Sequence, residues 1–151
     1  MCRGSFKKNG GQEQQALGRS RGGFSTKIHI LVEASGRPLK FLLTAGQLSD
    51  ITFAQEMMTG QSTEAFIGDK GYDSNAFVQW LEQQGIGVVI PPRSCRDNPR
   101  DYNAELYKER NLVERFINKI KWFRRIFARF EKLASRYLAF LHWAAALIWL
   151  R

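Results

Sequence analysis

The first half of the chain alternates between apolar and polar positions in a way that is typical of β-strands. The run 24–32 puts Ile28, Ile30 and Val32 on one face, and the run 39–44 is a second stretch of β-type composition. The sequence Ser-Gly-Arg-Pro between the two runs supplies turn residues. The pattern therefore predicts a β-hairpin.

Shorter periodic segments follow the hairpin. Helices are predicted over 49–58, where a serine or aspartate can cap the start, and over 73–84, where Gly85 ends the helix. The apolar runs 64–69 and 87–92 predict two buried strands, the second stopped by prolines. Strands that alternate with helices in this order predict an α/β domain with a mixed sheet.

The last third of the chain predicts two helices. A long helix over 105–130 is expected because apolar residues recur every seven positions, at Leu106, Val113, Ile120 and Phe127. A final helix follows Glu131. Its apolar part, 137–150, is interrupted by His142 and is shorter than the roughly 20 residues that span a bilayer. We therefore expect a buried core helix and no membrane partner.

Charge changes the picture from a generic α/β domain to one with a polyanionic partner. The chain carries 23 Lys and Arg against 14 Asp and Glu, a net charge of +9. Basic residues dominate 1–40 and 93–136, whereas acidic residues dominate 41–92. An acidic centre between basic flanks suits a protein that holds cations at one spot and phosphates around it. Solvated helix faces explain basic clusters more simply, but they do not predict the acidic centre.

Residues 1–23 are rich in Gly, Gln, Lys and Arg and are predicted to form a basic, disordered arm, which leaves 24–151 as the folded region. Arg19 and Arg21 in this arm could contact a phosphate or simply be exposed. Two distant cysteines and no metal-ligand spacing of the histidines favour a reduced cytoplasmic protein without zinc, associated with the nucleoid if it binds DNA.

Asp69 stands directly after the predicted strand, and the sequence allows two explanations for it. The apolar run 65–67 ends at Gly68, so the carboxylate comes at a strand tip where turn residues follow. Such an aspartate either caps the next element or points at a ligand. A second acidic residue presented in the same way elsewhere in the chain favours the ligand.

The second acidic residue is Glu114, on the predicted long helix. At 100° per residue, Tyr107, Arg110 and Lys121 fall on the same narrow stripe as this glutamate, beside the apolar face. Ion pairs from Glu114 to Arg110 and Lys121 explain the stripe without any ligand, at ~0.2–0.5 kcal/mol each. A metal site shared with Asp69 explains it as well, because divalent cations prefer carboxylate oxygens and nearby cations could hold DNA phosphates.

The motifs "GDKGYDS" and "VIPPRS", together with the spacing Y-x2-R-x3-E-x6-K on the long helix, resemble the DDE transposases of bacterial insertion sequences. The segments "GRSRGGFSTKIHILV" and "FLHWAAALIWL" are similar too, so the resemblance covers 17–151. It implies a ribonuclease H-like fold, Mg²⁺ or Mn²⁺ as cofactor, and hydrolysis then transesterification of DNA at transposon ends. The resemblance implies, by position, that Asp69 is the second acid of the triad and Glu114 the third. It implies likewise that Tyr107, Arg110 and Lys121 are signature residues that contact DNA or orient the site.

The first acid of that family lies on a strand before the hairpin, and no residue here matches it. Glu13 has no strand around it, Glu33 ends the first hairpin strand, and Asp50 follows the hairpin. We therefore expect 24–151 to be a partial, N-terminally truncated catalytic domain, or the downstream part of a split gene, that lacks the central first strand of the sheet.

Three functions stay open at this point. The chain is part of a transposase that acts on terminal repeats and target DNA, alone or as a homo-oligomer. Alternatively, it is a non-catalytic remnant that binds DNA and pairs with a full-length transposase. A different metal-dependent nuclease on the same fold is the third reading, which the helix signature disfavours.

Overall fold

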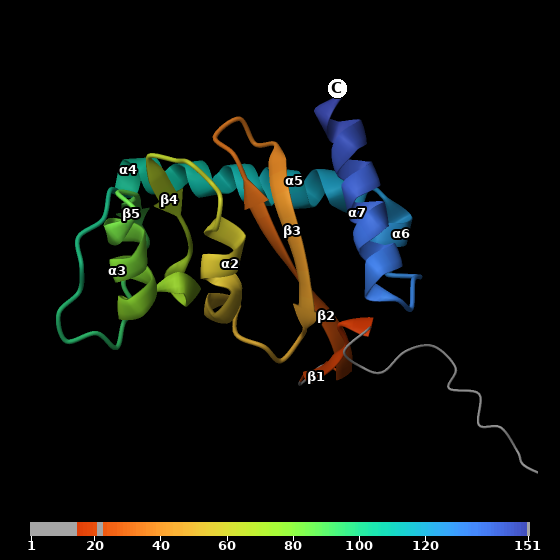
Figure 1. Ribbon diagram of the computed structural model, residues 1–151, viewed down its shortest axis with the longest axis horizontal. Coiled ribbons are helices and arrows are strands. Elements are labelled where there is room, and N and C mark those ends of the chain that lie inside the picture. The colour runs from red at the N-terminus through yellow and green to blue at the C-terminus, as the bar shows by residue number, and fades with distance from the viewer. Residues whose placement is uncertain (1–14, 21–22, 151) are drawn as a thin grey trace, which may run out of the picture.

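The structure is a computed structural model, and it describes residues 15–20 and 23–150. It has a mixed α/β architecture with two small sheets (Figure 1). The strands are β1 (Gly18–Ser20), β2 (Gly23–Val32), β3 (Pro38–Ala45), β4 (Ala65–Ile67) and β5 (Gly87–Val89). The α-helices are α2 (Ala54–Met58), α3 (Asn75–Gln83), α4 (Ala104–Tyr107), α5 (Asn111–Lys121), α6 (Arg124–Phe127) and α7 (Ala134–Trp149); the 3-10 helices are η1 (Asp50–Phe53), η2 (Lys70–Tyr72) and η3 (Lys108–Arg110).

The predicted hairpin is confirmed as β2 and β3. The two strands pair antiparallel from Thr26↔Ala45 to Val32↔Pro38. Gly36 takes a positive φ of 82° in the connecting turn, a conformation that glycine adopts without the steric cost that a Cβ imposes. One face of β2 packs on α5 and α7, whereas Leu31 on the other face packs against the cluster formed by α2, α3 and β5.

The end of the predicted arm forms a strand that the hydrophobic pattern does not indicate. Residues 18–20, expected in a loop, make β1 and pair antiparallel with the start of β2, Gly18 opposite Ser25. Backbone hydrogen bonds to β2 hold this strand, and such bonds leave no signature in side-chain periodicity. The prediction of disorder for 1–14, and any role of Arg21, concern residues outside those that the structure describes.

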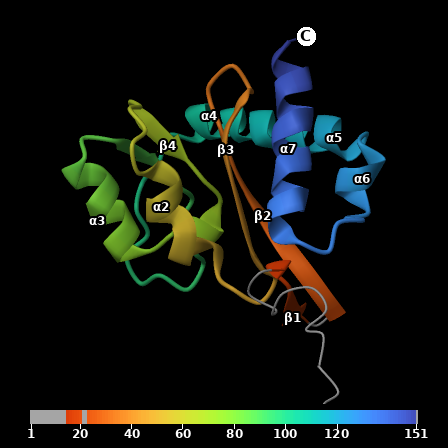
Figure 2. The same ribbon diagram turned by 45° about the vertical axis from the view of Figure 1, so that its right-hand side comes forward.

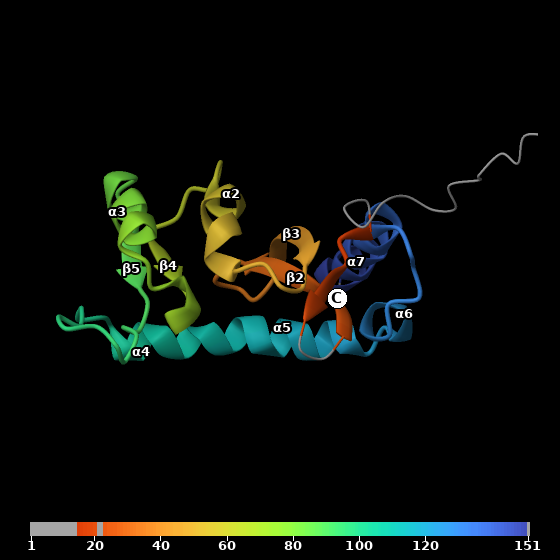
Figure 3. The ribbon, with the colours of Figure 1, turned by 90° about the horizontal axis from the view of Figure 1, so that it is seen from below.

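The expected single mixed sheet is replaced by two sheets. β1, β2 and β3 form an antiparallel sheet, while β4 and β5 form a separate parallel pair. Within the described ranges no strand joins β2 to β4, so the hydrogen-bonded ladder is interrupted there. The two sheets still share one support, because α4 and α5 run along one side of the molecule beneath both of them (Figure 3).

The predicted long helix over 105–130 is wrong in its second half. Regular helix ends at Lys121, and Phe123 has an extended backbone, with φ −82° and ψ 96°, before α6 begins. The break turns the chain back, so that Ile126 is buried and its carbonyl accepts a hydrogen bond of 2.8 Å from the Tyr137 hydroxyl. The seven-residue spacing of apolar positions also stops marking the buried face there, because its last member, Phe127, is 71% exposed.

The last helix is the buried core helix that the sequence predicts. α7 crosses α5 (Figure 2) and packs on β3, burying Tyr137, Leu141, Ala144 and Ala145. The Trp149 indole donates a hydrogen bond of 3.0 Å to the Pro38 carbonyl and so ties the helix end to the hairpin. None of the helices in the described part of the chain is long and apolar enough to cross a membrane.

Candidate functional site

Asp69 lies at the end of the short buried strand β4. Gly68 precedes it, and a Cβ at this glycine would lie 2.7 Å from the Phe66 ring, so only glycine fits there. The carboxylate caps η2, since Oδ1 accepts a hydrogen bond of 2.8 Å from the Gly71 amide. The side chain remains exposed. The capping role that the sequence allows is therefore present, on a carboxylate that solvent and ligands can reach.

The turn that carries Asp69 is held from the other side by Arg93. Its guanidinium donates to the Lys70 carbonyl at 3.1 Å and to the Gly71 carbonyl at 2.9 Å. The turn is thus fixed by hydrogen bonds at both its carbonyls and its capped amide, which limits the positions open to the Asp69 backbone.

A buried carboxylate, Asp73, organises the loop that supplies Arg93. Its side chain is 1% exposed and accepts hydrogen bonds from the Arg93 amide (2.8 Å), from Arg96 (2.5 Å) and from Arg100. Burial raises the pKa of the Asp73 carboxyl, but the hydrogen bonds from Arg96, Arg93 and Arg100, with the Arg100 charge, outweigh burial and lower the pKa to about 2. The carboxylate is therefore charged at every physiological pH.

The sequence patterns do not predict the Asp73 cluster, which consists of Asp73, Arg93, Arg96 and Arg100. Its members are 20 to 27 residues apart along the chain, in a turn and in a loop without periodic pattern. The one available signal is the pair of motifs "GDKGYDS" and "VIPPRS", which contain Asp73 and Arg93. Nothing local indicates that these two motifs contact each other.

Tyr72 connects Asp69 with a further acidic residue, Asp50. Burial, together with the negative charges of Asp50 and Asp69, raises the pKa of Tyr72 to about 12, so both carboxylates lie near the phenol. Asp50 is itself paired with Lys27 at 3.0 Å. Across residues 15–20 and 23–150, no three His, Cys, Asp or Glu side chains are grouped so that they could hold a metal ion.

The structure brings together three of the four residues of the Y-x2-R-x3-E-x6-K motif: Tyr107, Arg110 and Glu114. The Arg110 guanidinium lies 5.8 Å from the Tyr107 ring centroid and 2.5 Å from Glu114 Oε1. The intrahelical ion pair that the sequence allows is thus present, with half of the Glu114 side chain exposed. Lys121 is exposed at the end of α5, about 10 Å further along the helix axis. Asp69 and Glu114 do not share a hydrogen-bond partner: Asp69 accepts a hydrogen bond from the Gly71 amide, and Glu114 accepts one from Arg110.

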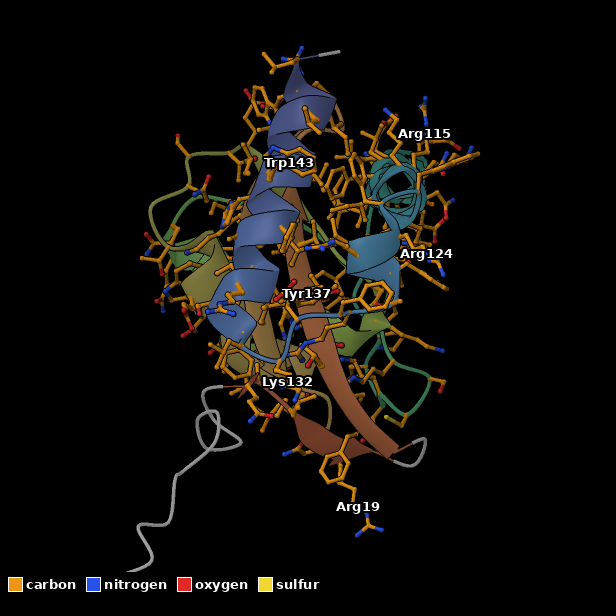
Figure 4. All side chains as sticks on the ribbon, turned by 90° about the vertical axis from the view of Figure 1, so that its right-hand side faces the viewer. Arg19, Arg115, Arg124, Lys132, Tyr137 and Trp143 are labelled. Carbon is orange, nitrogen blue, oxygen red and sulfur yellow. The ribbon has the colours of Figure 1, made fainter. Side chains whose placement is uncertain are left out.

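Arg19, the described member of the basic arm, is exposed on β1 and projects from the end of the molecule opposite the C-terminal end of α7 (Figure 4).

Comparisons with known proteins bear on these residues. A sequence model of the family described as "Transposase DDE domain" matches residues 3–149. The protein assigned as the transposase of insertion sequence element IS6501 in Brucella ovis is 34% identical over 131 residues, which cover 84% of this chain and 99% of that protein. The corresponding protein of IS402 in Burkholderia cepacia is 31% identical over 135 residues, covering 82% of this chain and 62% of its own length. No solved structure matches this one significantly.

Proposed function

Because this chain belongs to the transposase DDE domain family, we propose that it contributes Asp69 and Glu114 to metal-dependent cleavage and joining of DNA at transposon ends. The family resemblance of the motifs is confirmed by the family match and by both relatives. The observation that carries the proposal is the position of Asp69. It is an exposed carboxylate at a strand end, on a turn that Arg93 and the Asp73 cluster hold in place.

The donor chemistry of the two acids fits Mg²⁺ or Mn²⁺. Both ions prefer carboxylate oxygens, and Asp69 and Glu114 are both exposed carboxylates. A bound metal ion supplies Lewis-acid activation of the attacking water or 3′-hydroxyl and of the phosphate under attack. The family resemblance implies a third carboxylate beside these two, the first acid of the triad.

The two separate sheets also bear on where the first acid of the triad would lie in the fold. In a ribonuclease H-like domain, the strand with the first acid lies between the hairpin and the parallel strands. Here β2 and β4 are the strands that such a central strand would join, and α5 lies beneath both sheets (Figure 3). We propose that a strand with the first acid would pair between β2 and β4 when the complete catalytic site forms. Unpaired strand edges are otherwise sites of aggregation.

The experiment that tests the proposed function is nicking of a plasmid that carries the element's terminal repeats, with Mg²⁺ or Mn²⁺. Metal-dependent nicks at those ends would support the proposal. Binding to the ends without any nicking favours the second candidate function, a DNA-binding regulator that pairs with a full-length transposase. One observation favours this second candidate: Glu114 forms an ion pair with Arg110, which explains this glutamate without a metal ion.

Arg110 and Lys121 are proposed to hold DNA phosphates. Replacing either residue with Ala is expected to weaken DNA binding at low salt and to reduce the slope of log K against log salt by about 1, since each phosphate contact releases counterions. Fluorescence anisotropy of a labelled duplex over a range of salt concentrations measures this. Lys108→Ala is the matched control, because this exposed lysine pairs with Glu105 outside the signature stripe. An unchanged slope in the Arg110 and Lys121 variants would mean that these two residues form only ion pairs along the helix and do not contact phosphates.

A further inference from the structure

A groove between α6 and α7 lies at the other end of the molecule from β4 and the Asp69 turn (Figures 1 and 3). It has a volume of about 190 Å³. Its walls combine aromatic and aliphatic side chains with two arginines: Phe123, Ile126, Phe140, Trp143, Arg124 and Arg125. None of these residues belongs to the signature stripe or to the Asp73 cluster, so the proposed function leaves this groove without a role.

The aromatic side chains of the groove are ordered by contacts with each other. Trp143 meets Phe123 edge-on, with ring centroids 6.3 Å apart, yet 58% of Trp143 remains exposed. Arg125 lies over the Phe140 ring at 5.1 Å and is also 3.5 Å from Glu131. Trp143 from α7 and Arg124 from α6 lie on the same face of the molecule (Figure 4). The groove therefore presents flat rings with guanidinium groups at its edge.

The surrounding segment is strongly basic. Residues 115–136 contain eight Lys and Arg and a single acid, Glu131. Three further large apolar side chains in this segment are exposed: Trp122 at 90%, Phe127 at 71% and Phe130 at 60%. Exposed rings beside an excess of positive charge suit a partner that is anionic and has flat apolar rings of its own.

We propose that the α6–α7 groove binds an unpaired nucleotide of a DNA strand. Its base stacks on the exposed Trp143 ring beside Phe123, and the flanking phosphates contact Arg124 and Arg125. The volume agrees with one base, since it is below the roughly 300 Å³ at which sites for whole small molecules begin. This inference rests on the proposed function, because it takes DNA as the substrate, and it adds a second contact surface for a strand that has left the duplex.

Two other occupants fit the groove less well. A second copy of this chain would bring two basic segments of the same sign together, and like charges across an interface oppose association. Intact duplex DNA would satisfy the arginines through its phosphates, but its bases are stacked on each other and leave the exposed rings without partners. Unpaired DNA satisfies both the charge and the rings.

Trp143→Ala tests the proposal. Because Trp143 is largely exposed, the substitution leaves the core intact. Affinity for a short single-stranded oligonucleotide is expected to fall about tenfold, as for the loss of one stacked base, while affinity for duplex changes less than about twofold. Fluorescence anisotropy measures both affinities, and a 2-aminopurine in the strand reports stacking by quenching. Trp143→Phe keeps a ring and is expected to restore most of the binding.

Trp122→Ala is the matched control. It removes the same kind of side chain from the neighbouring basic segment 115–136, but Trp122 does not line the groove. Near-normal strand binding by this variant is expected. Equal losses in the Trp122 and Trp143 variants, equal losses on duplex and single strand, or no loss at all would overturn the proposal. Concentration-dependent self-association that Trp143→Ala abolishes in sedimentation experiments would assign the groove to a second copy.

The outcome for the wild-type chain separates this inference from the proposed function. A chain that binds neither duplex nor single strand contradicts both. A second outcome contradicts the groove proposal alone. In it, the wild-type chain nicks the terminal repeats, but the Trp143→Phe variant binds single strands no better than the Trp143→Ala variant does.

Discussion

Asp69→Asn is expected to reduce metal-dependent nicking at the transposon ends by more than about 100-fold, beyond the roughly 10–100-fold that second-shell changes around a metal cost. The substitution keeps an oxygen at the position that accepts the hydrogen bond from the Gly71 amide, so the cap of η2 and the local fold survive. It removes the negative charge that a divalent cation requires. The variant thus separates the two explanations of Asp69, because a pure capping role tolerates Asn.

The measurement is the rate of conversion of supercoiled plasmid to nicked circles, with Mg²⁺ and with Mn²⁺. Asp97→Asn is the control, since it makes the same chemical change on an exposed residue of the loop after β5. Duplex affinity, measured without metal, should be unchanged or slightly stronger in the Asp69 variant, because a negative charge near DNA is removed. Nicking by Asp69→Asn at the wild-type rate contradicts a metal-ligand role for this residue.

Asp73→Asn is expected to destabilise the fold by about 3 kcal/mol, the lower end of what is lost when one partner of a buried ion pair is removed. Asn offers one oxygen where Asp73 accepts hydrogen bonds on two. Arg96 and Arg100 are 20% and 32% exposed, so water partly compensates their charges. The loop would no longer be anchored to the Asp69 turn through Asp73. A smaller loss of nicking than in Asp69→Asn is expected as a consequence.

The effect has a defined pH dependence. The pKa of Asp73 is about 2 in the folded chain and about 3.9 in an unfolded one, so the unfolded state binds the proton first. The stabilisation from its charge is therefore complete above about pH 5 and is lost as pH falls through about 2. Chemical denaturation of both proteins at pH 7 and at pH 3 measures this. The difference in unfolding free energy should shrink at the lower pH.

Asp101→Asn is the control for that series, because Asp101 is exposed in the same loop. It should denature at the wild-type midpoint at both pH values. Equal midpoints for wild type and Asp73→Asn at pH 7 contradict a structural role for the buried carboxylate.

Local sequence patterns were sufficient for the elements that depend on near neighbours. β2 and β3 follow from alternation and turn residues, and α7 follows from its continuous apolar character. The strand–glycine–aspartate order at Asp69 and the helical stripe around Glu114 are local in the same sense, since a strand end and a helix face are defined within a few residues. These features define the candidate site without reference to any tertiary contact.

Features that depend on distant contacts were missed or misplaced. The sevenfold apolar repeat predicts helix through Phe130, but the helix ends at Lys121 because burial of Ile126 against Tyr137 requires the chain to turn. β1 forms only because β2 offers it backbone partners. Propensity is a weak preference in both cases, and packing or hydrogen bonding outweighs it.

Local patterns are sufficient to predict the hairpin, the alternation of strands and helices, the family motifs, and the positions of Asp69 at a strand end and Glu114 on a helix, because each is encoded within a few residues or a few turns of the chain. Three arrangements depend instead on tertiary contacts: the separation into two sheets, the turn at Phe123 that opens the α6–α7 groove, and the cluster of Asp73 with Arg93, Arg96 and Arg100. These arrangements join residues far apart along the chain, and their free energy comes from burial and charge pairing that no local pattern records.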